Sequence, residues 1–372
     1  MKYYIIAGEA SGDLHASNLM KELKKLDPDA AFHCWGGDLM AEQGADLVRH
    51  YRDLAFMGFF EILAHINTIA KNIRFCKKDI LEYYPDVLIL VDYPGFNLRI
   101  SRFAHEHGIT VFYYISPQLW AWRSSRVKKI KKNVDRMFVI LPFEKDFYAR
   151  YGYEVDFIGH PLLDAINGDT TYPGRKAFLE RNHLPDKPLV ALLPGSRRQE
   201  IRLMLEAMLK IVSSFGEYQF VIAGAPSISP DFYTGITAGT SVSIITGQTY
   251  DLLRHSEAAL VTSGTATLET ALMGIPQVVC YKGNFLSYLV ARSVIRVKYI
   301  SLVNLIMDKE IIRELIQDDL TSQNLRNELK KILDRTERLE IIQAYAGLRE
   351  KLGGSGASAK AAGLMIQYLK KN

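Results

Sequence analysis

Three glycine-containing loops carry the residues most suited to binding a charged ligand. Each follows a short apolar segment and precedes a segment of helical periodicity: GEASGD at Gly8–Asp13, LLPGSR at Leu192–Arg197 and TSGTATLE at Thr262–Glu269. Glycine lets the backbone turn tightly, and the free amides at a helix N-terminus attract anions. Each loop alone also fits a plain helix cap, but two of them in the second half of the chain favour phosphate binding. The candidate binding residues in these loops are Gly8, Glu9, Ser11, Gly12, Asp13, Gly195, Ser196, Arg197, Ser263, Gly264, Thr265 and Glu269.

The two loops of the second half suggest a ligand that contains a pyrophosphate, with an attached ribose near the second loop. Arg197 adds a permanent positive charge to the amides of its loop. Glu269 lies four residues after Thr265, on the same helix face, so a pyrophosphate at the helix start would place a ribose near its carboxylate. Neither GxGxxG nor GxxxxGK[ST] occurs, which argues against a nicotinamide-dependent enzyme and against a P-loop NTPase.

Asp92 is the candidate for acid–base chemistry. It comes directly after the apolar segment LILV, where a strand would deliver its carboxylate to the edge of a sheet. A carboxylate whose pKa is tuned by burial can act as a general base. An Asx-turn before Pro94 explains the same residue without catalysis, and Asn97 either orients Asp92 or caps the next helix.

Histidines and cysteines add little to the predicted chemistry. His15 and His160 are weaker catalytic candidates than Asp92, because a lone histidine is more often a structural hydrogen-bonding residue. Cys34, Cys76 and Cys280 lie far apart without metal-ligand spacing, so we expect no metal site, no cofactor and no disulfide framework.

Alternation of apolar and amphipathic segments positions these residues. Repeated βα units predict Rossmann-like, doubly wound parallel sheets in an α/β fold, in two lobes that face a cleft. The turn-rich stretch 168–174 separates an N-terminal lobe, residues 1–165, from a C-terminal lobe, residues 175–350. After the glycine-rich break Gly353–Gly356, the helix within residues 357–372 is expected to pack back on the first lobe or to exchange with a partner. The expected strands are Tyr3–Ala7, Val87–Val91, Val111–Ile115, Leu189–Leu193, Gln219–Ala223, Val242–Ile245 and Ala259–Val261. Helices are expected from Asp13 and over Ile100–His107.

Composition describes an ordinary folded chain. Of 372 residues, 48% are apolar and 23% charged, which excludes global disorder, collagen and a disulfide scaffold. The net charge of +5 is too small to imply nucleic acid. Glu9 and Asp13 interrupt any signal-peptide core, and no apolar stretch is long enough to span a membrane, so any membrane contact should be peripheral.

Two segments of the first half suggest such a contact. Apolar residues recur at helical spacing between Phe56 and Ile69, which fits either a core-facing helix or shallow insertion into a lipid interface. Six cations fall within Arg123–Lys132 without an acid, which fits either a solvated helix face or attraction to anionic headgroups or a substrate phosphate. The candidate membrane-facing residues are Phe56, Phe59, Phe60, Leu63 and Ile66.

The order of motifs resembles the lipid-A-disaccharide synthase family. Besides the three loops, the resemblance rests on LAFMG at Leu54–Gly58, SPQLWAWR at Ser116–Arg123, LPFE at Leu141–Glu144 and IGHP at Ile158–Pro161. It implies a GT-B glycosyltransferase of lipid A biosynthesis in Gram-negative bacteria. Such an enzyme joins UDP-2,3-diacylglucosamine to 2,3-diacylglucosamine 1-phosphate through a β-1,6 linkage and releases UDP. The resemblance also implies a cytoplasmic location at the inner face of the inner membrane.

Site roles carry over from the family only at matching positions. The resemblance implies that Asp92 is the catalytic base, that Arg197 binds nucleotide, and that Ser263–Thr265 and Glu269 hold the diphosphate and ribose. Asn304 matches a family asparagine, while Val303 stands where proline is usual. Family dimers exchange C-terminal segments, which the Gly353–Gly356 break would suit.

Two other functions remain open on sequence grounds. One is a soluble GT-B enzyme similar to a UDP-N-acetylglucosamine 2-epimerase, which needs no acyl-binding surface. The other is a non-catalytic lipid- or nucleotide-binding protein at the membrane. Release of UDP that depends on both acylated sugars would distinguish the synthase from both.

Overall fold

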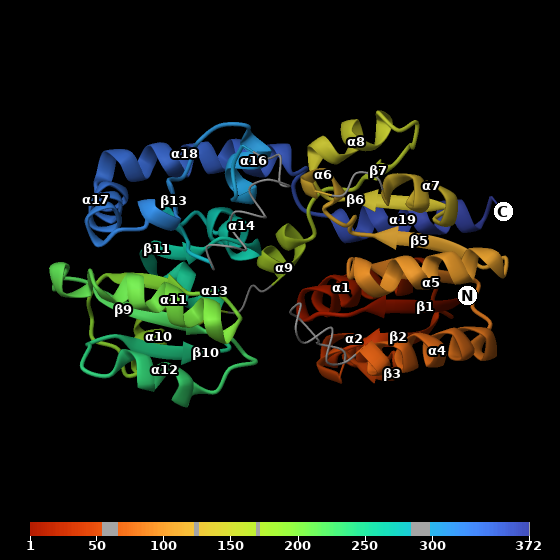
Figure 1. Ribbon diagram of the computed structural model, residues 1–372, viewed down its shortest axis with the longest axis horizontal. Coiled ribbons are helices and arrows are strands. Elements are labelled where there is room, and N and C mark those ends of the chain that lie inside the picture. The colour runs from red at the N-terminus through yellow and green to blue at the C-terminus, as the bar shows by residue number, and fades with distance from the viewer. Residues whose placement is uncertain (54–65, 123–125, 169–171, 284–297, 372) are drawn as a thin grey trace. The chain divides into compact units, whose positions relative to one another are not determined.

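The chain forms two compact units. The computed structural model describes residues 1–53, 66–122, 126–168, 172–283 and 298–371. The first unit is Met1–Asn167 together with Leu352–Asn372, and the second is Gly168–Lys351. Each unit has one sheet with helices on both faces (Figure 1).

A parallel sheet organises the first unit. Within the described residues its strand order is β3-β2-β1-β4-β5-β6-β7. Its central strand β4, VLILV, is buried at every position, as expected of a strand covered on both faces. The strands are β1 (Lys2–Ala7), β2 (Ala31–Gly36), β3 (Asp46–His50), β4 (Val87–Val91), β5 (Thr110–Tyr114), β6 (Arg136–Val139) and β7 (Asp156–Phe157).

Helices cover both faces of this sheet because its side chains alternate between two cores. Tyr4 and Ile6 of β1 face the core that includes α4, α5 and α7, whereas Tyr3 and Ile5 face the core that includes α1 and α19. The helices are α1 (Ala10–Leu26), α2 (Asp38–Glu42), α4 (Ile66–Tyr83), α5 (Pro94–Glu106), α6 (Leu119–Trp122), α7 (Val127–Asn133), α8 (Pro142–Ala149), α9 (Leu162–Gly168) and α19 (Ala357–Leu369), with a 3₁₀ turn η1 at Tyr51–Asp53.

The second unit repeats the architecture. Within the described residues its parallel sheet has the order β10-β9-β8-β11-β12-β13. Its strands are β8 (Leu189–Leu193), β9 (Gln219–Gly224), β10 (Ser243–Thr246), β11 (Ser256–Thr262), β12 (Gln277–Tyr281) and β13 (Glu314–Ile316). Its helices are α10 (Arg175–Arg181), α11 (Arg198–Leu209), α12 (Pro230–Thr237), α13 (Thr249–Arg254), α14 (Thr265–Leu272), α16 (Leu302–Met307), α17 (Ser322–Leu333) and α18 (Arg335–Lys351), with 3₁₀ turns η3 (Val212–Ser214) and η4 (Gln317–Asp319).

The strand order of each sheet reverses at one point. The reversal falls between β1 and β4 in the first unit and between β8 and β11 in the second. Loops after these strands diverge to opposite faces of the sheet, which leaves room for a ligand at the carboxyl edge. The prediction of two doubly wound parallel sheets is confirmed.

The C-terminal segment belongs to the first unit. Ala361, Met365 and Ile366 of α19 are buried in the core that α1 shares. The carboxylate of Asp164 accepts hydrogen bonds from the amides of Gly356 (2.6 Å) and Ser358 (2.8 Å) at the start of α19. A negative charge at a helix N-terminus is favourable, so Asp164 helps to hold α19 in place.

Two helix starts differ from the sequence-based expectation. The helix predicted to begin at Ile100 begins at Pro94, because proline suits the first turn of a helix. The helix predicted to begin at Asp13 begins at Ala10, so Asp13 lies inside its first turn.

Candidate active site

Asp92 lies at the reversal point of the first sheet. It directly follows β4, whose Val91 pairs with Ala7 at the end of β1. Burial raises the pKa of its carboxyl to about 7, the negative charge of Glu9 adds to this shift, and the Tyr93 amide opposes it. Half-buried and near neutrality, this carboxyl can accept a proton at physiological pH.

The backbone at Asp92 is strained. Asp92 and Tyr93 have φ values of 42° and 46°, the left-handed region that side chains rarely adopt. Such residues cost about 1–3 kcal/mol each and persist only when surrounding contacts hold them. Contacts around Asp92 must therefore hold the backbone in this conformation.

That support comes from α5 and β5. The Asn97 side-chain amide donates hydrogen bonds to the carbonyls of Val91 (3.2 Å) and Asp92 (2.8 Å). The Tyr113 hydroxyl donates a second hydrogen bond to the Asp92 carbonyl, at 2.6 Å. Asn97 is fully buried, so its contacts orient the turn at Asp92.

The GEASGD loop supports this turn from β1. A Cβ atom at Gly8 would collide with the ring of Tyr93, so glycine is needed for the ring to approach. Gly12 packs closely on Ala7, and Ser11 is exposed.

Asp13, a predicted binding residue, has structural contacts within the first unit. Its buried carboxylate accepts hydrogen bonds from the amides of Gly37 (2.8 Å), Leu39 (3.2 Å) and Met40 (3.1 Å). These are the free amides at the start of α2, which an acidic side chain satisfies. Asp13 is therefore a structural residue that joins α1 to α2.

In the second unit, the loop after β8 lies at the sheet's reversal point. Gly195 has φ 103°, and a Cβ atom there would collide with the Glu200 carboxylate. The Ser196 amide donates a hydrogen bond to that carboxylate at 3.2 Å. Arg197 is the N-cap residue of α11, so its charge lies beside a helix N-terminus. An anion at this loop would meet Arg197 and the start of α11.

The loop after β11 lies beside it on the same sheet edge. Val261 of β11 pairs with Leu193 of β8, and each loop begins just after its strand. Gly264 and Thr265 are exposed at the start of α14, while the Ser263 hydroxyl donates to the Ile300 carbonyl at 3.2 Å. The free amides of α14 are thus open to a ligand.

Glu269 lies one turn along α14 and is held by Tyr250. The Tyr250 hydroxyl donates to the Glu269 carboxylate at 2.9 Å. Burial raises the pKa of Glu269, and the Tyr250 hydrogen bond partly offsets the shift. Neither Tyr250 nor, in the first unit, Tyr113 was predicted as a site residue, because no sequence motif distinguishes either tyrosine.

Asn304 has the contacts of a structural residue. It is fully buried, donates to the Ile312 carbonyl (2.8 Å) and to Glu314 (2.9 Å), and accepts from the amides of Ile311 (2.8 Å) and Ile312 (3.1 Å). These contacts use both donors and both acceptor sites of the side-chain amide, which favours a structural role for Asn304 over direct ligand binding.

Val303 is accommodated in the first turn of α16. It is fully buried, and the helix is capped by the Ser301 side chain. A first-turn amide needs no helical partner, so α16 does not depend on the proline that is usual here.

The two histidines considered in the sequence analysis are buried. Burial lowers the pKa values of His15 and His160 to about 4 and about 3, so both are neutral near pH 7.

The candidate membrane-facing residues Phe56, Phe59, Phe60 and Leu63 lie outside the described residues, and of Ile66 only its place at the start of α4 is described. Across the described ranges, no cluster of three or more His, Cys, Asp or Glu is arranged to hold a metal ion, and no helix is long and apolar enough to cross a membrane.

Comparison with known proteins identifies the family. The family model described as lipid-A-disaccharide synthetase matches residues 3–366. The chain belongs to the lipid-A-disaccharide synthase family. It is 40% identical to the lipid-A-disaccharide synthase of Geobacter sulfurreducens, over 99% of this chain and 97% of the relative. It is 41% identical to that of Syntrophus aciditrophicus, over 99% and 98%.

Solved structures share the fold at low sequence identity. A UDP-GlcNAc 2-epimerase from Neisseria meningitidis has a TM-score of 0.71 and 14% identity, with all of both chains covered. The glycosyltransferase of kitacinnamycin has a TM-score of 0.65 and 15% identity, with 99% of both chains covered. The predicted GT-B fold, family and enzyme class, a glycosyltransferase of lipid A biosynthesis, are confirmed.

Proposed function

We propose that this chain joins UDP-2,3-diacylglucosamine to 2,3-diacylglucosamine 1-phosphate, giving a β-1,6-linked lipid A disaccharide 1-phosphate and UDP, with Asp92 as the general base. The observation that carries the proposal is the half-buried Asp92 carboxyl at the first reversal point, with its pKa raised to about 7. Family membership supplies the reaction class.

In the proposed reaction, the acceptor's 6-hydroxyl gives its proton to the Asp92 carboxylate. The hydroxyl oxygen forms a bond to the donor's anomeric carbon from the face opposite UDP. The bond from that carbon to the phosphate oxygen breaks, and UDP leaves with the electron pair. Inversion at the carbon follows from attack opposite the leaving group.

The second unit would bind UDP. Arg197 and the helix starts at Arg198 and Thr265 would offset the charge that develops on the leaving diphosphate. Glu269, held by Tyr250, would accept hydrogen bonds from the ribose hydroxyls. Gly195, Ser263 and Gly264 would let the loop backbones lie close to the phosphates.

The test is incubation of the full chain with both acylated sugars, followed by mass spectrometry. The proposal expects an acylated disaccharide 1-phosphate and an equal amount of UDP, and no UDP when either sugar is omitted. UDP release without the acceptor, or no disaccharide at all, would contradict it.

The alternative function is that of a UDP-N-acetylglucosamine 2-epimerase, because an epimerase of this kind with a solved structure shares the fold. It is disfavoured because the curated relatives, matched over nearly the whole chain, are lipid-A-disaccharide synthases. Conversion of UDP-N-acetylglucosamine to its 2-epimer, without acylated sugars, would support the epimerase instead.

We also propose that the protein binds peripherally to the inner face of the inner membrane. Support comes from exposed lysines on α7, including Lys128, Lys131 and Lys132, which would be attracted to anionic headgroups. Sedimentation with vesicles should show binding to phosphatidylglycerol that falls with added salt. Equal recovery with neutral vesicles would contradict an electrostatic contribution.

A dimer that exchanges α19 is the last part of the proposal. Gly353, Gly354 and Gly356 precede α19 with positive φ values, so this connection can adopt other paths. Light scattering should then give twice the chain mass, and a cysteine pair joining α1 to α19 should cross-link two chains. A monomer throughout would contradict it.

A further inference from the structure

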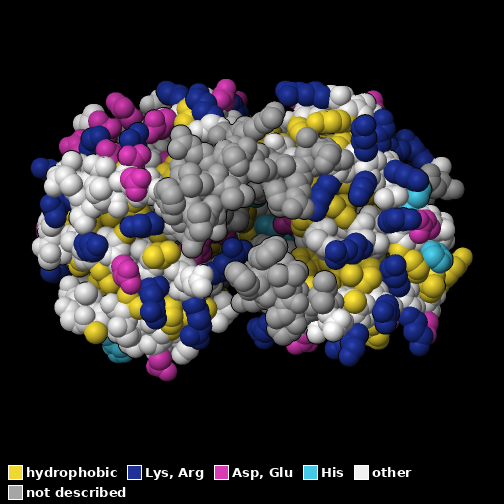
Figure 2. Space-filling model, in the orientation of Figure 1, with side chains coloured by type: hydrophobic (Ala, Val, Ile, Leu, Met, Phe, Trp, Pro, Cys, Tyr) yellow, Lys and Arg dark blue, Asp and Glu magenta, His cyan; other side chains and the backbone are white. Residues whose placement is uncertain are grey.

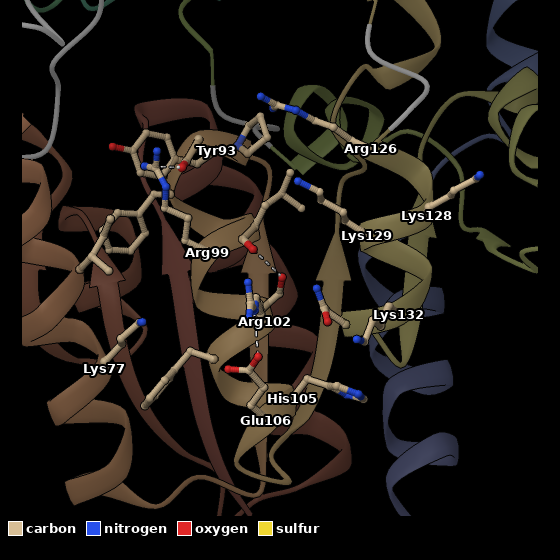
Figure 3. A pocket seen from close by; sticks show the side chains of 18 of the residues that line it. Lys77, Tyr93, Arg99, Arg102, His105, Glu106, Arg126, Lys128, Lys129 and Lys132 are labelled. Carbon is tan, nitrogen blue, oxygen red and sulfur yellow. Dashed lines mark hydrogen bonds and ion pairs between the residues drawn. The ribbon is translucent and has the colours of Figure 1, made fainter.

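A large groove crosses one helical face of the first unit. It has a volume of about 1090 Å³ and lies among α4, α5 and α7, on the side of the sheet that these helices cover (Figure 3). Among the described residues, seven Lys or Arg residues line it against one acid, Glu106, a balance of +6. The cations are Lys77, Arg99, Arg102, Arg126, Lys128, Lys129 and Lys132.

Most of this charge has no ion-pair partner. Arg102 pairs with Glu106 at 2.8 Å. Among the residues that the structure describes, no ion pair forms at Lys77, Arg99, Lys128, Lys129 or Lys132. Figure 2 shows Lys and Arg side chains gathered over this part of the unit. Crowded like charges raise the local potential and favour an anionic ligand.

The second unit provides a contrast within the same chain. Among its described residues, several cations pair with acids, including Lys331 with Glu328 at 2.8 Å, Arg313 with Glu310 at 3.0 Å, and Arg338 with Glu257. The groove instead retains a concentrated positive charge.

Apolar side chains share the groove with the cations. Ile69 and Ile73 of α4 and Leu98 and Phe103 of α5 line it and are only partly buried. A ligand that suits both kinds of wall carries a negative charge and a hydrocarbon portion.

One end of the groove adjoins Asp92. Tyr93, Pro94 and Gly95, the residues directly after Asp92, line it. Arg126 also lines it, and its charge acts on Tyr113, whose hydroxyl holds the Asp92 carbonyl. Arg99 lies five residues into α5 from Pro94, about 7.5 Å along the helix.

We propose that this groove binds the acceptor, with Arg99 and Lys129 holding the phosphate on its anomeric carbon and the apolar wall taking part of an acyl chain. This inference rests on the proposed function and adds a subsite for the acceptor. Figure 3 shows Lys129 extending from α7 toward α5, which carries Arg99. The phosphate would be held at the end of the groove near Asp92, while the 6-hydroxyl at the other side of the sugar reaches the base.

The groove's cations could instead bind the anionic headgroup of a membrane lipid, which also carries a phosphate. A headgroup would be attracted by all the cations of the face, whether or not they line the groove. A dedicated phosphate subsite should depend on Arg99 and Lys129 but not on Lys131, an exposed lysine of α7 that donates to the Tyr151 carbonyl (3.3 Å) and does not line the groove.

The test compares binding of 2,3-diacylglucosamine 1-phosphate and of its dephosphorylated form in neutral detergent micelles. Wild-type protein should bind the phosphorylated form at least tenfold more tightly. Arg99→Gln and Lys129→Gln should each weaken that binding about tenfold and leave the dephosphorylated form unaffected, while Lys131→Gln should change neither. Binding to phosphatidylglycerol vesicles is measured on the same variants.

Three outcomes would contradict the proposed phosphate subsite. The wild-type protein could bind the phosphorylated and dephosphorylated acceptors equally, or Lys129→Gln and Lys131→Gln could weaken acceptor binding equally. The third is that the Arg99 and Lys129 variants lose vesicle binding but keep acceptor binding. Because binding needs no turnover, the subsite can fail while the wild-type protein still makes disaccharide. Tight, phosphate-dependent binding without disaccharide formation would contradict the proposed function instead.

Discussion

The two reversal points are built differently, although the two sheets share the same order over their first six strands. At the first, ordinary side chains occupy left-handed backbone: Asp92 at φ 42° and Tyr93 at φ 46°, with Asn97 and Tyr113 holding the turn. At the second, Gly195 takes the positive φ, and Gly264 and Thr265 are exposed. The first arrangement fixes one carboxylate in place, and the second leaves backbone amides open to a ligand. We infer that the first unit supplies the chemistry and the second holds the nucleotide.

The sharpest test of this division replaces the fixed carboxylate. Asp92→Asn should reduce turnover by about 10²–10⁴-fold, because an amide cannot accept the proton. The dissociation constant of UDP should not change, since its proposed site lies in the other unit. Initial rates and calorimetric titration with UDP measure the two effects.

Thermal unfolding provides the control for this variant. Because the pKa of Asp92 is raised to about 7, protonated Asp92 favours the fold, and this contribution is lost as pH rises through 7. Asp92→Asn should therefore be at least as stable as wild type at pH 8, with a smaller difference near pH 4. A lower Tm at pH 8 would point to lost structure.

The next largest effect is expected on UDP binding by the second unit. Arg197→Ala should weaken UDP binding roughly 10–100-fold, because a hydrogen bond to a charged group contributes about 1.5–3 kcal/mol. The neighbouring Arg198, which lies over the Phe232 ring at 5.1 Å, is the matched control. Arg198→Ala should leave UDP affinity within about twofold; equal losses in both variants would remove Arg197 from the proposed role.

Removing a hydrogen bond that supports the strained turn at Asp92 should have a smaller effect on activity. Tyr113→Phe removes the 2.6 Å hydrogen bond to the Asp92 carbonyl and should lower kcat about tenfold, with little change in the KM of the donor. Tyr3→Phe is the control, because it removes a hydroxyl that bonds Asp27 at 3.0 Å, elsewhere on the same sheet. If both variants lose activity equally, the loss reflects general stability.

The smallest effect is expected at Tyr250. Tyr250→Phe removes the 2.9 Å hydrogen bond to Glu269 and should raise the KM of the donor about threefold, with kcat nearly unchanged. Steady-state kinetics at saturating acceptor measures both constants. A fall in kcat instead would place Glu269 in the chemical step.

The sequence predicted the fold well because parallel strands are buried on both faces. Segments such as VLILV and LVALL are continuous apolar runs, and each was assigned to its strand. Strands β2, β3, β6, β7, β12 and β13 were not predicted. Of these, DLVRH in β3 and the two-residue DF in β7 lack such a run.

The site was predicted less completely because side-chain partners are set by tertiary packing. Asp92 was found from its place after a strand, whereas Tyr113 read as one apolar strand residue among several. Asp13 and Asn304 lie in the first turns of α1 and α16, yet their side chains accept hydrogen bonds from neighbouring backbone amides. Arg99 lies some thirty residues before the cation run of α7, and only the fold brings the two helices to one groove.

The central claim is that Asp92 acts as the base with a pKa near neutrality, and the pH dependence of kcat/KM tests it most directly. The rate of disaccharide formation should rise about tenfold per pH unit below about 7 and level off above it. Glu9→Gln should move this break to lower pH, because the Glu9 charge helps to raise the pKa of Asp92. A break near pH 4, or a rate that is flat from pH 5 to 9 and unaffected by Glu9→Gln, would contradict the account.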